Sequence, residues 1–265
     1  MKKGILLAAF GSASHLGEKA LKNFAEDVRA RFPDARVRFA FTSDHMRNRM
    51  AAAGKKTDSV KKALRRMGFE GYTHVAVQSL HLIPGREYEV LLEEVLEAGR
   101  QGGPEHIAVG MPLLQDPEDI LLAAEALLSH LPAERKADEA VICVGHGTWH
   151  NGAASYEALA RVVNLSDRLL FIGTLAGAHG IDTLLPAVRA TGAATVWLLP
   201  LLSIVGKHAE LDMAGTGAAS WRSRISQMGI TCKPVLKGTV EYTGFAKIWL
   251  MHLARALQEL PEACR

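Results

Sequence analysis

Eight short apolar runs alternate with amphipathic stretches along this chain, and no other feature constrains its fold as strongly. Runs that predict strands cover residues 4–10, 36–42, 74–80, 106–111, 140–145, 169–173, 194–200 and 230–235. Stretches that predict helices cover residues 17–31, 57–67, 86–100, 117–130, 152–163, 180–190, 208–228 and 242–259. Nearly continuous apolar strands separated by helices are typical of a parallel sheet covered on both faces. The pattern therefore predicts an α/β protein.

The last four strands repeat the plan of the first four. The stretches "LIPGREYE" (82–89) and "SIVGKHAE" (203–210) follow the third and seventh strands, and they share isoleucine, glycine, a base and glutamate at equal spacing. The polar stretch "HLPAERKADE" (130–139) separates the two sets. We therefore expect two tandem doubly wound parallel-sheet lobes with a cleft between them, an N-terminal lobe over 1–132 and a C-terminal lobe over 133–265.

Composition narrows the class of protein. The chain has 265 residues, is 48% hydrophobic and carries a formal charge of +3. It is long enough to bury a core without disulfides, and its mild charge does not predict nucleic-acid binding. The densest basic cluster, Lys61-Lys62 with Arg65-Arg66, lies on a predicted helix, where a solvated face is the favoured interpretation. The three cysteines, Cys143, Cys232 and Cys264, form no CxxC pair, which indicates a reducing compartment.

The first residues, "MKKGILLAAFGSAS", imitate a signal peptide. The apolar part spans only Ile5 to Phe10, and no clear A-x-A site follows it. We interpret this segment as the first strand and expect a cytoplasmic protein. No apolar run approaches the ~20 residues of a membrane span, so no membrane partner is expected.

Ligands of open α/β sheets bind beyond the carboxyl ends of the strands, and two facing lobes place such a site between them. Histidines gather at these positions: seven of the 11 lie near predicted strand ends, namely His15, His45, His81, His146, His150, His179 and His208. A hydrogen-bonded structural histidine is the favoured interpretation for most of them, and also for His74, His106, His130 and His252.

His146 and His208 are the exceptions. They follow the fifth and seventh strands, and glycines at 145, 147 and 206 flank them. Two neutral imidazoles are good ligands for Co, Ni, Fe or Zn, and near pH 7 an imidazole also accepts a proton. Both residues are therefore the candidate catalytic and metal-binding groups.

Other motifs are weaker. GxGxxG, GxxxxGK[ST], GxSxG and HExxH are all absent from the sequence. The acids at the two matching turns are Glu87, Glu89, Glu210 and Asp212, which as helix N-terminal residues are favoured by the macrodipole. The bases Arg47, Arg49, Arg86 and Lys207 are either solvated or face carboxylates of a ligand.

Several blocks in order resemble one family. They are "LLAAFGSA", "FAFTSDHMRNRM", "VAVQSLHLIPGREYE", "VGMPLL", "VGHGTWH" and "LPLLSIVGKHAELDMAG" with a later "SW". Together they are similar to the anaerobic cobalt chelatases, the sirohydrochlorin cobaltochelatases of the class II chelatase group. The resemblance runs from about residue 3 to 255, so it covers nearly the whole chain.

The resemblance implies a tetrapyrrole between the lobes and insertion of Co²⁺ into sirohydrochlorin, an early step of anaerobic cobalamin synthesis, without ATP or an organic cofactor. Fe²⁺, which would give siroheme, and Ni²⁺ are alternative metals. The metal-binding histidines of the family fall on His146 and His208. Candidate substrate-binding residues are Ser12, Arg86, Glu87, Glu89 and Lys207. The partners are then the tetrapyrrole and a divalent metal; a homo-oligomer stays open.

One position departs from the family pattern. A glutamate usually follows the sixth strand as a further metal ligand, but this loop reads "GTLAGAHG" and the matching residue is Ala176. His179, an acid such as Glu87 or Glu89, or water are the candidate replacements. A third histidine would soften the site and favour another metal. A non-catalytic or retuned tetrapyrrole- or metal-binding protein is therefore the main alternative. A bilobed periplasmic solute-binding protein is a second alternative. Such a protein is expected to carry a convincing signal peptide, which the sequence does not show.

Overall fold

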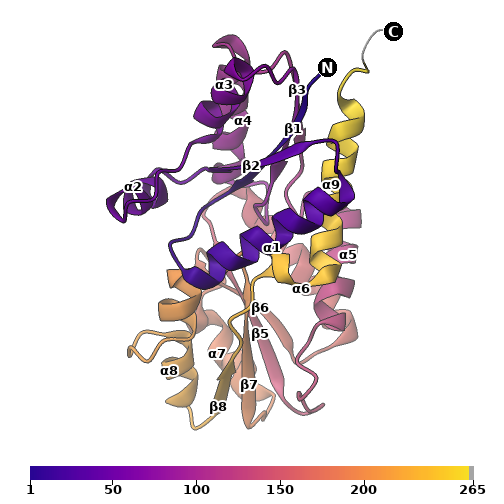
Figure 1. The fold of residues 1–265 in the computed structure, drawn as a ribbon. Coiled ribbons are helices and arrows are strands. Elements are labelled where there is room, and N and C mark those ends of the chain that lie inside the picture. The colour runs from indigo at the N-terminus through magenta and orange to yellow at the C-terminus, as the bar shows by residue number, and fades with distance from the viewer. Residues whose placement is uncertain (263–265) are drawn as a thin grey trace.

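The computed structural model describes residues 1–262, and these form two four-stranded parallel sheets, one above the other in Figure 1. The first sheet has the order β2-β1-β3-β4 and the second the order β6-β5-β7-β8. The strands are β1 (Lys3–Ala9), β2 (Arg36–Phe41), β3 (His74–Ser79), β4 (His106–Gly110), β5 (Ala140–Gly147), β6 (Leu170–Ala176), β7 (Thr195–Leu201) and β8 (Thr231–Pro234). All eight predicted strands are confirmed.

The two sheets repeat one topology, as the matching sequence blocks predict. The first strand of each set lies between the second and third, so Ile5 of β1 pairs with Val37 and Ala76, while Val141 of β5 pairs with Leu170 and Trp197. The prediction of an α/β fold with two parallel-sheet lobes is confirmed.

Nine α-helices lie between and after the strands in the described residues. They are α1 (His15–Arg31), α2 (Asp44–Ala52), α3 (Val60–Phe69), α4 (Arg86–Arg100), α5 (Pro117–Ser129), α6 (Ala154–Ser166), α7 (Ile181–Ala190), α8 (Trp221–Ser226) and α9 (Thr243–Glu259). Three short helical turns complete the description: η1 (Asn151–Ala153), η2 (His208–Met213), which is a π-helix, and η3 (Thr239–Glu241).

Three apolar clusters hold the layers together. One packs the outer face of the first sheet against α3 and α4, and another packs the outer face of the second sheet against α7, η2 and α8. The third and largest joins the lobes, because side chains of α1, α5, α6 and α9 pack with the inner faces of both sheets. The lobes therefore share one continuous core.

Helix α9 returns from the second lobe to the first, as the yellow ribbon in Figure 1 shows. It packs against β3, β4 and α5, with the fully buried Trp249 edge-on to Phe24 of α1 at 6.2 Å between ring centres. His252 Nε2 meets Asp119 Oδ1 at 2.8 Å in a buried pair, which is the structural role expected for this histidine. The strands of the two sheets fall on either side of residue 132 in the sequence. A division into domains at 132/133 stays a prediction, because α9 follows the second sheet in the sequence but packs against the first lobe.

Two helical segments differ from the pattern. Helix α2, where Ser43 accepts a hydrogen bond from the Met46 amide, was not predicted, because only Met50 of its residues is buried and no apolar stripe marks it. The helix expected over 208–228 is broken into η2 and α8. Gly215 lies at the break, and Ser220 begins α8 by accepting from the Ser223 amide.

Two further observations concern the cysteines and membrane-spanning helices. Cys143 is a buried free thiol in β5 and Cys232 is half-buried in β8, whereas Cys264 lies outside the described residues. Within residues 1–262, no helix combines the length and the apolar character that crossing a bilayer requires.

Truncation of Trp249 tests the shared core. Trp249→Ala should lower the free energy of unfolding by about 3–5 kcal/mol, because a fully buried indole leaves a cavity between α9 and α1. Urea unfolding followed by circular dichroism measures the change. As a control, Leu165→Ala should change it by less than about 0.5 kcal/mol, since Leu165 is 88% exposed. Equal effects of the two substitutions would contradict the packing described for α9.

Candidate metal centre

His146 lies near the carboxyl end of β5 with its side chain exposed. The next residue, Gly147, has a φ of +77°, and a Cβ there would lie 1.9 Å from the carbonyl oxygen of Ala176. Only glycine satisfies both conditions, because other residues rarely adopt this φ and the neighbouring strand leaves no room. This glycine therefore turns the chain directly after His146.

His208 reaches the same edge from another strand. It is the first residue of η2, which follows β7, and β7 is the direct neighbour of β5. The two imidazole rings are 5.0 Å apart between their centres, with an interplanar angle of 79°. The convergence of His146 and His208, predicted from their places after the fifth and seventh strands, is thus present in the structure.

This spacing matches two imidazoles that bind one ion. With metal–nitrogen bonds of about 2.0–2.1 Å and an angle between perpendicular and tetrahedral, two such rings have their centres about 5 Å apart. The π-helix that begins at His208 is also informative, because single π-turns occur frequently at functional sites.

Hydrogen bonds at Nδ1 leave Nε2 of both rings available. His146 Nδ1 lies 3.0 Å from the Gly147 carbonyl oxygen, and His208 Nδ1 lies 2.7 Å from Asp212 Oδ2. Both partners only accept, so each Nδ1 donates and, in the neutral ring, the lone pair is on Nε2. Asp212 was interpreted from sequence as a helix N-terminal acid; its spacing of four residues from His208 is the signal for this contact.

The first lobe contributes residues that the sequence did not single out as partners of the pair. The ring of Phe10, directly after β1, lies 6.3 Å from the ring of His146. Ser14 Oγ donates to Glu210 Oε1 of η2 at 2.5 Å. These contacts bring the loop after β1 against the edge of the second lobe that carries the histidine pair.

Ser12, a predicted substrate-binding residue, is buried. Its Oγ donates to the Val205 carbonyl oxygen at 3.1 Å and accepts from the Ser14 amide at 3.0 Å. In this structure its hydroxyl joins the two lobes.

The other predicted substrate-binding residues lie at the matching turns. Glu89 Oε1 is 3.0 Å from His150 Nε2, which is a contact across the lobes, and Arg86 pairs with both Glu89 and Glu93. The hydrogen bond from Arg86 is the main cause of the lowered pKa of Glu89. Glu87 is half-buried in the first turn of α4, and Lys207 is exposed directly before η2. Their contact with substrate stays a prediction.

The position of the expected third ligand holds a methyl group. Ala176 ends β6 opposite Gly147 of β5, at the same edge as the histidine pair. His179 Nε2 contacts Glu157 Oε1 at 3.2 Å instead of joining the pair. Within residues 1–262, no group of three or more His, Cys, Asp or Glu side chains is placed to hold a metal ion. The structure thus offers two converging imidazoles, and His179 as third ligand stays a prediction.

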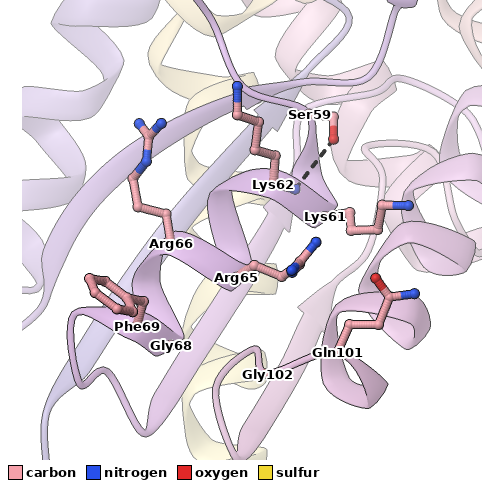
Figure 2. Close-up of a pocket in the computed structure, with 9 residues that line it drawn as sticks. All are labelled: Ser59, Lys61, Lys62, Arg65, Arg66, Gly68, Phe69, Gln101 and Gly102. Carbon is pink, nitrogen blue, oxygen red and sulfur yellow. Dashed lines mark hydrogen bonds between the residues drawn. The ribbon is translucent and has the colours of Figure 1, made fainter.

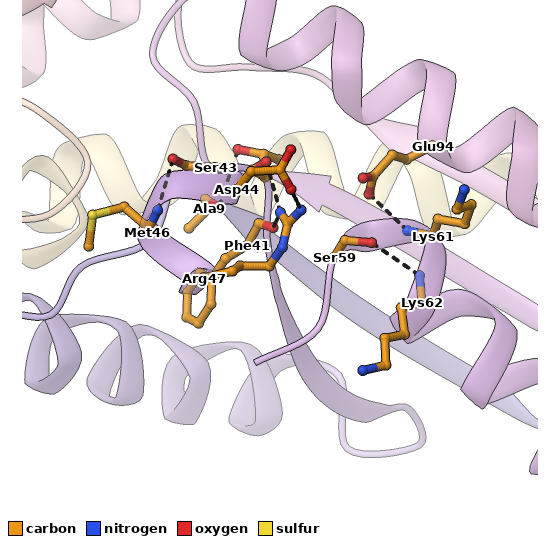
Figure 3. Close-up of polar contacts among 11 residues, drawn as sticks. Ala9, Phe41, Ser43, Asp44, Met46, Arg47, Ser59, Lys61, Lys62 and Glu94 are labelled. Carbon is orange, nitrogen blue, oxygen red and sulfur yellow. Dashed lines mark hydrogen bonds and ion pairs between the residues drawn. The ribbon is translucent and has the colours of Figure 1, made fainter. Parts of the chain in front are cut away.

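Arg47, one of the bases considered for binding carboxylates, is engaged within its own lobe. Its guanidinium donates to the carbonyl oxygens of Phe41 and Thr42 and pairs with Asp44 (Figure 3). These bonds anchor the start of α2 to the end of β2.

A cavity of about 780 Å³ lies away from the histidine pair, on α3 and the turn after α4 (Figure 2). Lys61, Lys62, Arg65 and Arg66 line it, so this is the basic cluster noted in the sequence. Lys62 and Arg66 pair with Asp58 and Lys61 pairs with Glu97, which supports the interpretation of a solvated face.

His81 shows how a histidine at a strand end serves structure. It is buried directly after β3, with Nδ1 2.9 Å from Ser79 Oγ and Nε2 3.1 Å from Thr42 Oγ1. Burial lowers the pKa of this imidazole to about 4. His81 is therefore neutral near pH 7 and ties the ends of β2 and β3 together.

Comparison with solved structures shows the same fold in a metal chelatase. The structure described as SirB from Bacillus subtilis with Fe³⁺ superposes with a TM-score of 0.67 at 15% identity, covering 97% of this chain and 96% of that one. This chain therefore shares its fold of two parallel-sheet lobes with that protein.

Sequence comparison is more specific. The family model described as "Cobalt chelatase (CbiK)" matches residues 3–258, and the chain belongs to this family. Sirohydrochlorin cobaltochelatase CbiKC of Nitratidesulfovibrio vulgaris is 55% identical over 261 residues, covering 98% of this chain and 93% of the relative. The sirohydrochlorin cobaltochelatase of Salmonella typhimurium is 32% identical over 259 residues, covering 97% of each chain.

The buried His81 predicts a pH dependence of stability. Its pKa is about 4 when folded and about 6.5 in an unfolded chain, so the unfolded state binds more protons between these values. Its contribution to stability is complete above about pH 6.5 and decreases as pH falls toward 4. Lowering the pH from 7 to 5 should cost about 2 kcal/mol of unfolding free energy through this group.

Urea unfolding at both pH values measures this effect. His81→Gln should remove this part of the pH dependence. An unchanged slope in the variant would show that other groups cause the decrease.

Proposed function

We propose that the protein inserts Co²⁺ into sirohydrochlorin and that His146 and His208 hold the entering ion. The observation that carries the proposal is the pair of imidazole rings 5.0 Å apart at the carboxyl edge of the second sheet. Membership of the cobalt chelatase family supplies the reaction class, and the cobaltochelatases of two other organisms supply the substrate by similarity.

Insertion exchanges one Co²⁺ for the two protons of the pyrrole N–H groups. The ion must lose water ligands as it approaches the ring, and two neutral imidazoles on one side replace part of that shell. Imidazole also accepts protons near pH 7, so the two histidines, once released from the metal, can each take up one of the two pyrrole protons and pass it to water. No ATP and no organic cofactor enters this scheme.

The tetrapyrrole is proposed to lie between the lobes, facing the histidine pair. Sirohydrochlorin carries eight carboxylates, so basic residues near this edge are suited to bind it. Arg86 and Lys207 occupy equivalent places in the two matching turns and are both exposed. They are the proposed carboxylate partners, while Ser12, Glu87 and Glu89 line the same region.

The coordination shell is proposed to be completed by water at the place left by Ala176. Ala176 lies opposite Gly147, the residue after His146, so the proposed water position is next to the histidine pair. A site of two imidazoles and water is suited to Co²⁺ and also to Fe²⁺ or Ni²⁺, since all three bind imidazole. Cobalt is favoured because the family model is that of a cobalt chelatase.

Removal of either imidazole tests the assignment. His146→Ala and His208→Ala should each lower the rate of Co²⁺ insertion by at least about 100-fold, beyond the loss that changes around a metal ligand usually cause. The absorbance change of sirohydrochlorin on metal insertion measures the rate.

Both variants should unfold within about 0.5 kcal/mol of the wild type, because both side chains are exposed. The matched control is His106→Ala, which should keep full activity. His106 begins β4, so it lies at the amino end of a strand in the first sheet and not at a carboxyl edge. Turnover at the wild-type rate in either test variant would refute the role of that histidine.

A glutamate at position 176 tests whether water completes the proposed coordination shell. Ala176→Glu should bind Co²⁺ about tenfold more tightly or better, a gain of about 1.4 kcal/mol, because a third protein ligand replaces water. Equilibrium dialysis measures this affinity without relying on turnover. Ala178→Glu, exposed in the same loop, is the control and should leave the affinity unchanged.

The same variant separates the catalyst from the alternative of a tetrapyrrole- or metal-binding protein. Insertion by the wild type, altered in Ala176→Glu, supports a chelatase whose metal site has been retuned. Binding of metal and tetrapyrrole without insertion in both proteins would favour the binding protein.

A further inference from the structure

Asp212 lies one π-helical turn after His208, on the same face of η2. Its Oδ2 is 2.7 Å from His208 Nδ1, a short distance for this kind of hydrogen bond. We propose that Asp212 is the positioning residue of the metal site: it fixes the imidazole of His208 with Nε2 free for the entering ion. This inference rests on the proposed role of His208 as a metal ligand.

A contribution to stability does not account for this pair. The side chains of His208 and Asp212 are 51% and 55% exposed, and exposed ion pairs contribute little to folding. Within residues 1–262, the Asp212 carboxylate forms a hydrogen bond only with His208. Its one hydrogen bond in the described residues is therefore to a residue of the proposed metal site.

The chemistry of the contact determines which nitrogen is free. An ionised carboxylate only accepts hydrogen bonds, so Nδ1 carries the hydrogen and, in the neutral ring, Nε2 carries the lone pair. A carboxylate in this place also makes the imidazole a stronger donor to the metal, and it restricts rotation of the ring. Asp212 can therefore act on the ion without touching it.

The two histidines are held in different ways. His146 donates to a backbone carbonyl oxygen, that of Gly147, which is neutral and which no substitution removes. His208 donates to a charged side chain. Since Ala176 supplies no carboxylate, Asp212 is, in the described part of the chain, the one anionic group hydrogen-bonded to either histidine of the pair. Because both proposed ligands are neutral imidazoles, the affinity of the site for a divalent cation should depend strongly on the negative charge of Asp212.

The neighbouring acid cannot take over this task in the observed arrangement. Glu210 lies on the same π-helical turn, but its Oε1 accepts from Ser14 Oγ of the first lobe at 2.5 Å. The turn thus carries two acids with separate partners: Glu210 joins the lobes and Asp212 orients the ligand.

The affinity of the full chain for Co²⁺, measured without sirohydrochlorin, tests the proposal. Asp212→Ala should weaken Co²⁺ binding about 10- to 100-fold in equilibrium dialysis, the range for removal of an outer-shell partner. Asp212→Asn keeps an oxygen acceptor but loses the charge, so its affinity should lie between those of Asp212→Ala and the wild type. The visible absorption band of bound Co²⁺ should shift in both variants.

Steady-state kinetics add a second readout. Because Asp212 acts through the metal ligand, the KM for Co²⁺ should rise in Asp212→Ala while the KM for sirohydrochlorin stays unchanged. The matched control is Glu105→Ala, which removes the acid from another partly exposed histidine pair, Glu105 with His106 at 3.6 Å. This control should bind Co²⁺ as the wild type does.

A double variant separates this inference from the proposed function. In a His208→Ala background, Asp212→Ala should cause no further loss of Co²⁺ affinity, because the residue it orients is gone. Wild-type affinity in the single Asp212→Ala variant, or an equal loss in both backgrounds, would overturn the positioning role alone. Wild-type Co²⁺ affinity in His208→Ala would overturn the assignment of His208 and the inference with it.

Discussion

Strands β5 and β7 lie side by side in parallel, with Gly145 opposite Leu201. In this register both strands end at the same edge, so the segments that follow them begin side by side. His146 and His208, which are 62 positions apart in the sequence, meet there for that reason. An antiparallel pairing would send them to opposite ends of the sheet. The convergent pair thus follows from strand direction, and the rest of the site is arranged around it.

The parts that could be predicted from sequence are those with a local signal. Strands buried on both faces are visible as apolar runs, and the carboxyl-edge rule places the histidines after β5 and β7 together. Helix α2 lacks such a signal because it buries only Met50. The break between η2 and α8 was missed although Gly215 and Gly217 interrupt the helical pattern and Ser220 is a typical N-cap residue. The periodicity of apolar residues indicates which face of a helix is buried, but it gives less information about where the helix ends.

Contacts between the lobes could not be predicted, because they depend on how two separately patterned units dock. Ser12 donates to the Val205 carbonyl oxygen of the other lobe, a contact that its place after the first strand did not indicate. Ser14 meets Glu210, and His150 meets Glu89, although nothing in the sequence pairs them. By contrast, the substitution at Ala176 is evident from the family pattern, and the structure places its methyl group beside the turn that follows His146. Comparison with a family pattern shows a substituted position more readily than it shows a new contact between lobes.

Helix α9 is the last element of the described chain, yet it packs against β3, β4 and α5 of the lobe that begins the chain. Trp249 and His252 bury themselves in that lobe. During synthesis on the ribosome, the first sheet therefore forms with one of its covering helices still untranslated. The N-terminal lobe can complete its packing only after residues 243–259 have been made, because its inner face lacks this covering helix until then.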